Sequence, residues 1–283
     1  MRFRATGERY FACQMSALTR ITDHVYWMPP GPPDRPSLCS VVGKRRTLML
    51  DAGSSAAHAR AFVEALRSAG GTRPSAVVYT HEDWDHVLGG AELGGIVIAH
   101  ALTAERLIEL GERDWSDEGL DRRVADGLSS AQHVADVKAE MPSPRAVEVA
   151  PADIVFHDRI EIDLGGVTVR VRHIGGDHSA DSCVMYVEPD GVLFMGDCTS
   201  ASPEGVMTSE SAFRLREVVL GSAAEYFIEG HHESVSSRTD MEDLFEKMRL
   251  AERAAHEGLE IEASDQDTDY FIEAFRAGVT TTL

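Results

Sequence analysis

The sequence predicts an α/β fold in which strands and helices alternate and pack in layers. Apolar, β-branched runs such as 75–80 follow segments with helical spacing such as 56–69, an alternation typical of layered α/β proteins. The chain has 283 residues, 43% of them hydrophobic, which is enough for a buried core. Since no repeat or low-complexity linker divides it, we expect one domain over 20–283, preceded by an N-terminal extension over 1–19.

The expected elements follow in chain order. Residues 20–28 alternate like a strand that stops at the prolines of 29–33, and Ser37–Val42 and Thr47–Leu50 form a hairpin. Helix 56–69 and the strands 75–80 and 96–99 come next. The segment of about 102–140 is charged, helical in period and poor in strands, so we interpret it as an inserted helical wall or lid over the site. The remaining expectations are strands at 153–156, 159–163, 167–174, 183–187 and 192–196, and helices at about 211–219, 239–257 and 267–277.

The composition narrows the class of function. The net charge is −20, from 27 basic and 47 acidic residues, and such a field repels phosphate backbones and anionic membranes. The sequence shows neither a transmembrane run nor the apolar core of a signal peptide, and its four cysteines form no C-x-x-C pair. We therefore expect a cytoplasmic protein that acts on a small molecule, with neither a nucleic acid nor a membrane as partner. A homo-oligomer and an alternative start at Met15 stay open.

The densest group of chemically active side chains directly follows the expected strand 75–80. His81, Asp83, Asp85 and His86 lie within six residues of one another. Imidazoles and carboxylates packed this closely repel or compete unless a cation binds them. A divalent metal ion, or a pair of them, is the economical explanation.

Three further candidate ligands follow apolar stretches far along the chain. His178 lies in Gly-Gly-Asp-His after strand 167–174, Asp197 in Gly-Asp after strand 192–196, and His231 in Gly-His. Neighbouring glycines permit the tight turns that direct such side chains, and functional groups converge at strand ends in layered α/β proteins. Seven ligands suit a dinuclear site, in which a carboxylate and a hydroxide bridge two metals.

These motifs together resemble the metallo-β-lactamase superfamily, over about residues 20–235. The shared order is Asp51, an H-x-D-x-D-H version of the family's H-x-H-x-D-H motif over 81–86, and then the three glycine-flanked ligands. The resemblance implies a four-layer αββα sandwich with the metals at the edge between its sheets, and a hydrogen bond between Asp51 and a ligand histidine that fixes the histidine ring. The ligands it implies are His81, Asp83 and His178 for one metal and Asp85, His86 and His231 for the other, with Asp197 as the bridge.

Asp83 departs from the family pattern, because most members have a second histidine at this position. A carboxylate is a harder, anionic ligand that shifts preference toward Fe or Mn relative to Zn, and the flavodiiron branch likewise has an acidic residue there. We expect two divalent ions with Zn favoured, and Fe or Mn as alternatives because of Asp83. Asp83 could also hydrogen-bond without binding metal, leaving a single occupied site.

The resemblance implies a metal-dependent hydrolase in which a hydroxide at the dinuclear site cleaves an ester, thioester, lactone or related bond. Asp85 and Asp197 are the expected catalytic residues, Asp85 by handling the proton. The alternative is a diiron or mono-iron redox enzyme of the same fold, such as an oxygenase or an oxygen or nitric oxide reductase. The intact ligand set argues against a non-catalytic metal-binding module, and the charge argues against a nuclease.

Ordinary structural roles compete with some of these assignments. His232 is an alternative to His231 as ligand, although the Gly-His order favours His231. His173 is expected to be a strand residue, and Cys198 should point away from the metals because side chains alternate along a strand.

Overall fold

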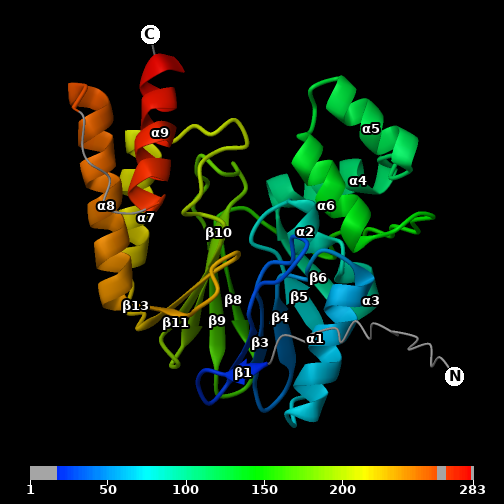
Figure 1. Ribbon diagram of the computed structural model, residues 1–283. Coiled ribbons are helices and arrows are strands. Elements are labelled where there is room, and N and C mark those ends of the chain that lie inside the picture. The colour runs from blue at the N-terminus through cyan, green and yellow to red at the C-terminus, as the bar shows by residue number, and fades with distance from the viewer. Residues whose placement is uncertain (1–17, 260–265, 282–283) are drawn as a thin grey trace, which may run out of the picture.

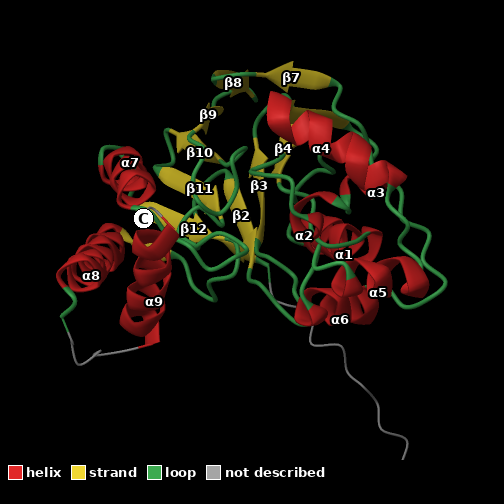
Figure 2. Cartoon of the chain, turned by 90° about the horizontal axis from the view of Figure 1, so that it is seen from above, coloured by secondary structure: helices red, strands yellow, loops and turns green. Residues whose placement is uncertain are grey.

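Two β-sheets stacked face to face, with helices on both outer faces, build the molecule (Figures 1 and 2). The computed structural model describes residues 18–259 and 266–281. Most of the expected N-terminal extension, including Met15, lies outside the described residues. The four layers are helices, sheet, sheet and helices in that order, which confirms the predicted αββα sandwich.

The first sheet is formed by the N-terminal part of the chain. Its strands lie in sequence order: β1 (Thr19–Arg20), β2 (Val25–Met28), β3 (Leu38–Val42), β4 (Thr47–Leu50), β5 (Ala76–Val78), β6 (Ile96–His100) and β7 (Ile154–Phe156). The strands from β1 to β4 are antiparallel and those from β4 to β7 are parallel. The single strand expected over 20–28 is two strands joined by a tight turn, in which the Thr22 hydroxyl accepts a hydrogen bond from the Val25 amide.

The second sheet has the order β13-β12-β11-β10-β9-β8. Its strands are β8 (Arg159–Asp163), β9 (Thr168–His173), β10 (Cys183–Glu188), β11 (Val192–Gly196), β12 (Tyr226–Glu229) and β13 (Ser236–Ser237). The parallel pair β11–β12 directs the carboxyl ends of both strands toward the same edge. Asp197 and the segment that carries His231 leave the sheet at that edge.

Helices cover the outer face of each sheet. On the first sheet lie α1 (Ala56–Ser68), α2 (Trp84–Val87), α3 (Gly90–Leu93), α4 (Ala101–Glu112), α5 (Asp117–Ala125) and α6 (Ala131–Glu140). On the second lie α7 (Ser209–Leu220), α8 (Arg238–Glu257) and α9 (Gln266–Thr281). The segment 102–140 is helical as expected, and its three helices stand at the top of Figure 1, across the molecule from α7, α8 and α9. That it is an insertion stays a prediction.

In the central strands, such as β4 and β11, alternating side chains enter a core on each face, so both faces are buried. In β4, Leu48 and Leu50 enter the core between the two sheets, while Met49 enters the core under the N-terminal helices. In β11, Phe194 enters the core between the sheets and Leu193 packs under the C-terminal helices. Strands covered on both faces are continuously apolar, so their ends are the first places where polar side chains can gather. None of the described helices is both long and apolar enough to cross a membrane.

Candidate metal centre

All seven expected ligands lie in one cluster at the edge where the two sheets meet. Their nitrogen and oxygen atoms form overlapping groups, each with all ligand atoms within 4.8 Å of one another. We call His81, Asp83 and His178 the Asp83 group, and Asp85, His86 and His231 the Asp85 group. Asp197 lies between the two groups.

The Asp83 group is compact. The Oδ2 atom of Asp83 lies 3.5 Å from Nε2 of His81 and 3.3 Å from Nε2 of His178. The two Nε2 atoms are 3.2 Å apart. Asp83 occupies the N-cap position of α2, yet its side chain makes no capping hydrogen bond and instead faces the two histidines.

The Asp85 group repeats this arrangement on the other side of Asp197. Oδ2 of Asp85 lies 3.4 Å from Nε2 of His86 and 3.1 Å from Nε2 of His231. Oδ2 of Asp197 is 3.5 Å from His86, 3.4 Å from His231 and 3.7 Å from His178, in each case to Nε2. One carboxylate oxygen therefore faces ring nitrogens of both groups.

These spacings fit metal ions better than direct hydrogen bonds. Ligand atoms about 2.1 Å from a tetrahedral ion lie about 3.4 Å from one another, which is the spacing found in both groups. Among the described residues, Nε2 of His86 and Oδ1 of Asp197 are buried without a hydrogen-bond partner. Buried polar atoms without partners are rare in native proteins unless an ion or water completes them. The residues present thus fit a pair of divalent ions.

The buried carboxylate of Asp51 fixes one ligand ring. Its Oδ2 lies 2.7 Å from Nδ1 of His86 and accepts a hydrogen bond from the Thr80 hydroxyl at 2.7 Å, while Oδ1 accepts one from the Thr80 amide at 2.6 Å. Because the Thr80 hydroxyl donates to Asp51, it is free to accept from Nδ1 of His81, 2.9 Å away. Both histidines then carry their proton on Nδ1 and present an Nε2 lone pair to the cluster. The hydrogen bond predicted for Asp51 is present.

The other two histidines are held from different loops. Nδ1 of His178 donates to the backbone carbonyl of Ala201 at 3.3 Å, and Nδ1 of His231 lies 3.5 Å from Oδ1 of Asp34. With Nδ1 protonated in both rings of the Asp83 group, two lone pairs face each other at 3.2 Å, an arrangement that needs a cation or an extra proton between them. The role of Asp34 was not predicted, because its only signal in the sequence is a charged residue within the proline-rich loop.

Glycine allows the last ligand segment to approach the cluster. A Cβ atom at Gly230 would lie 2.0 Å from Oδ1 of Asp197, so a side chain there would displace Asp197. At Gly196 the backbone has φ +53°, and a Cβ would lie 2.6 Å from the Thr80 hydroxyl. The glycines noted in the sequence therefore serve close backbone approach as well as turns.

Without metal, neighbouring carboxylates raise the pKa of His86 and of His231 and so hold protons on both rings. Burial lowers the pKa of His231, but its contacts with Asp197 and Asp85 outweigh burial and raise that pKa to about 10. Burial acts in the opposite direction on Asp197, yet His86 and His231 hold the pKa of its carboxyl well below the usual range. The pKa of Asp83 is lowered as well, because its two histidines outweigh burial. Metal ions must displace these protons.

The structure also places the competing residues. His232 turns away from the cluster, and its Nδ1 lies 3.0 Å from the carbonyl of Ser234. Cys198 belongs to no ligand group among the described residues. His173 is a strand residue at the end of β9, where its ring stacks on that of His100 with centroids 3.8 Å apart. Trp84 and Trp115 are both buried in the core under the N-terminal helices.

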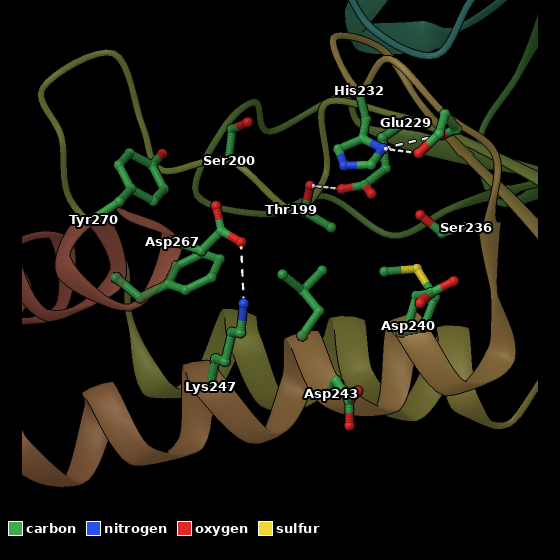
Figure 3. A pocket seen from close by; sticks show the side chains of 14 residues that line it. Thr199, Ser200, Glu229, His232, Ser236, Asp240, Asp243, Lys247, Asp267 and Tyr270 are labelled. Carbon is green, nitrogen blue, oxygen red and sulfur yellow. Dashed lines mark hydrogen bonds and ion pairs between the residues drawn. The ribbon is translucent and has the colours of Figure 1, made fainter. Parts of the chain in front are cut away.

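A pocket adjoins the cluster on the side of the C-terminal helices. A pocket of about 170 Å³ reaches Asp197 and His231, and it shares part of its lining with a larger one of about 480 Å³ between β12, α8 and α9. Figure 3 shows the larger pocket, with Glu229 and His232 on one wall and the ion pair of Lys247 and Asp267 opposite. The residues common to both pockets are Thr199, Ser200, Glu229 and His232.

One family model and several solved structures are similar to this chain. A family model described as metallo-beta-lactamase superfamily matches residues 32–250. A metallo-beta-lactamase from Pontibacter korlensis is 16% identical with a TM-score of 0.55, covering 81% of this chain and 96% of that one. The sec-alkylsulfatase Pisa1 from Pseudomonas sp. is 12% identical with a TM-score of 0.61, covering 93% of this chain but 50% of its own. At such identities these likenesses show the fold alone, and no curated protein sequence matches the chain.

Proposed function

The chain belongs to the metallo-beta-lactamase superfamily, and on that premise we propose that it is a metal-dependent hydrolase. Its substrate is a small molecule with an ester, thioester, lactone or related bond. The net charge of −20 supports this choice over a nucleic acid. The sulfate ester named for the alkylsulfatase neighbour is one related bond to include among candidate substrates.

One observation carries the proposal: Oδ2 of Asp197 lies within 3.7 Å of ring nitrogens from both ligand groups. A carboxylate in this position can join two ions rather than hold one. A pair of divalent ions, with Zn favoured, would lower the pKa of water and polarise a carbonyl oxygen when bound there.

The side chains of the site position the ligands and accept the proton. Asp197 holds the two groups together, and Asp51 keeps the Nε2 lone pair of His86 directed into the site. Oδ2 of Asp85 is the carboxylate oxygen closer to Nε2 of His231, and the other oxygen of Asp85 remains available. We therefore assign to Asp85 the uptake of the proton released by the attacking water. The adjoining pocket gives the remainder of a substrate a place beside Asp197.

The proposal is tested by elemental analysis followed by a hydrolysis panel of lactones, thioesters, carboxylate esters and a secondary alkyl sulfate. We expect about two Zn per chain and hydrolysis of at least one class that disappears in Asp197→Ala. Asp126→Ala, which removes an exposed carboxylate at the C-cap of α5, is the matched control. Full hydrolytic activity in a metal-free preparation would contradict the proposal.

The orientation of Asp83 favours a second candidate, an iron-dependent redox enzyme of the same fold. Its carboxylate faces the ligand cluster rather than capping α2, so the harder ligand is in place to bind iron. Visible absorbance and iron content of the purified protein separate the two candidates. An iron-loaded protein whose colour and iron are lost in Asp83→His would favour redox chemistry, and a colourless zinc protein would favour hydrolysis.

A further inference from the structure

Three basic side chains gather near the metal centre from three successive helices. Arg113 follows the last residue of α4, Arg123 lies in the last turn of α5, and His133 lies in the first turn of α6. These helices form the group at the upper right of Figure 1. Acidic side chains also lie nearby, because Glu82, Asp83 and Glu109 act electrostatically on Arg113.

Arg113 has donors without acceptors. Its guanidinium is half-buried and lies over the ring of Trp115, 5.0 Å from the centroid, yet it makes no hydrogen bond or ion pair with any residue that the structure describes. Burial and the nearby charge of Arg123 lower its pKa to about 10. No Arg113 nitrogen is among the buried atoms without a partner, so the five N–H donors of its guanidinium reach solvent and are available to an acceptor.

The side chain of Arg123 also has hydrogen-bond donors without acceptors among the described residues. Its side chain donates to the carbonyl of Leu128 at 3.2 Å, and within the described ranges no carboxylate lies within 4.0 Å of it. Its helix-end position suits the helix dipole but leaves most of its donors unpaired. The neighbouring Arg122, in contrast, pairs with Asp114 at 2.5 Å. The other basic side chains near these helices also have carboxylate partners: Arg106, Lys138 and Arg145.

The side chains of Arg113 and His133 lie within electrostatic reach of the segment that carries Asp83 and Asp85. The ring of His133 meets the edge of Trp84, with centroids 5.7 Å apart, and Trp84 is the residue between Asp83 and Asp85. Those two carboxylates, together with Arg113 and Arg123, act electrostatically on His133, whose pKa is lowered chiefly by burial. The Asp83 side chain is 43% exposed here, so this side of the cluster is open to a ligand.

We propose that Arg113, Arg123 and His133 form a binding site for an acidic group of the substrate, a carboxylate, sulfate or phosphate, remote from the bond that is cleaved. The inference rests on the proposed hydrolase function and names its substrate class. An acid group would accept hydrogen bonds from both guanidinium groups and reduce their mutual repulsion. Anion binding at this wall places the reacting end of the molecule over the metal centre.

Binding is tested first, without relying on turnover. Calorimetric titration of the metal-loaded full chain with glutarate, methyl sulfate and methyl phosphate at constant ionic strength covers the three acid types. We expect at least one to bind, and Arg113→Gln and Arg123→Gln each to weaken that binding about 10-fold to 100-fold, as expected for a hydrogen bond between charged groups. Arg122→Gln removes the same charge from the same helix and is expected to bind like the native protein.

Kinetics then separate this inference from the proposed function. Two 4-nitrophenyl esters are compared, one of glutaric acid with a free carboxylate and one with a carboxamide in its place. We expect Arg113→Gln to raise KM for the carboxylate ester alone, with kcat and metal content unchanged. Acid binding that is unaltered in both arginine variants, or an equal loss for both esters, would overturn the anion site while leaving hydrolysis intact. Acid binding without hydrolysis of any panel member would instead overturn the hydrolase.

Discussion

The two ligand groups have the same composition, two histidines and one aspartate, but different surroundings. In the Asp83 group, the aspartate side chain is 43% exposed, whereas the Asp85 side chain is 7% exposed. The Nδ1 atoms of the Asp83 group face neutral acceptors, the Thr80 hydroxyl and a backbone carbonyl. Those of the Asp85 group face the carboxylates of Asp51 and Asp34.

This difference teaches that equal ligand sets need not be equal sites. A carboxylate behind a histidine increases its basicity and fixes its orientation more strongly than a neutral acceptor does. The Asp85 group should therefore hold its metal more tightly. The Asp83 group, whose aspartate is the more exposed of the two and which lies near Arg113, Arg123 and His133, is the half where metal identity can vary.

The largest expected difference comes from matched substitutions of the two aspartates. We expect Asp85→Asn to lower kcat by about 10²–10⁴, because it removes a ligand and the proposed proton acceptor together. Asp83→Asn should lose one metal per chain, but its kcat should fall less than that of Asp85→Asn, since the Asp85 group and Asp197 remain. Steady-state kinetics and metal content on both variants test this order. Equal losses in kcat would show that the two groups are equivalent.

A second difference concerns the carboxylates that hold the histidines. Asp51→Asn should weaken binding of the tighter metal by about 10-fold to 100-fold, the usual effect of losing such a partner. Asp34→Asn should have a smaller effect, because Asp34 lies 3.5 Å from His231 whereas Asp51 lies 2.7 Å from His86. Competition with a chromogenic chelator measures both affinities. A larger loss in Asp34→Asn would reverse the proposed ranking.

The pH dependence should have opposite signs for metal affinity and for metal-free stability. The pKa of His231 is raised to about 10 in the absence of metal, from an ordinary value of 6.5. Its ion pairs therefore stabilise the metal-free protein fully below pH 6.5, and this stability is lost as pH rises through 10. Metal binding displaces that proton, so affinity should rise about tenfold per pH unit between pH 7 and 9.

Thermal unfolding of chelator-treated protein and metal titrations across this range measure the two trends. We expect the Tm of the metal-free protein to fall between pH 7 and 9.5 while metal affinity rises. His232→Gln, which removes a neighbouring histidine outside the cluster, should leave both slopes unchanged. A metal-free protein whose Tm rises over this interval would contradict the assignment of the protonated state.

The clustering of the candidate ligands was predictable from sequence because they follow apolar strands, and the parallel strands β11 and β12 end at the same edge. The layered α/β class was predictable from the alternation of strands and helices, and the αββα arrangement from the resemblance of the ligand motifs to the metallo-β-lactamase superfamily. The contacts behind the ligands were not. Asp34 meets His231 across about two hundred residues of chain, and no spacing rule connects them. The division of the expected strand 20–28 into β1 and β2 was not predicted either, because the turn between them depends on the hydrogen bond from the Val25 amide to the Thr22 hydroxyl.

The smallest predicted effect concerns another contact that the sequence did not predict, a hydrogen bond between Tyr270 and Ala201 behind the Asp83 group. The hydroxyl of Tyr270, on α9, accepts a hydrogen bond from the Ala201 amide at 2.7 Å, and the Ala201 carbonyl in turn orients His178. Tyr270→Phe removes that acceptor while keeping the ring, so we expect metal affinity of the Asp83 group to fall about 2-fold to 10-fold, the value of one neutral hydrogen bond. The metal of the Asp85 group should be unaffected, because no ligand of that group contacts Ala201 in the described structure. Metal titration resolves the two classes of site, and Phe271→Leu on the same helix controls for altered packing of α9. A change confined to the tighter site would show that the C-terminal helix acts on the other half of the centre.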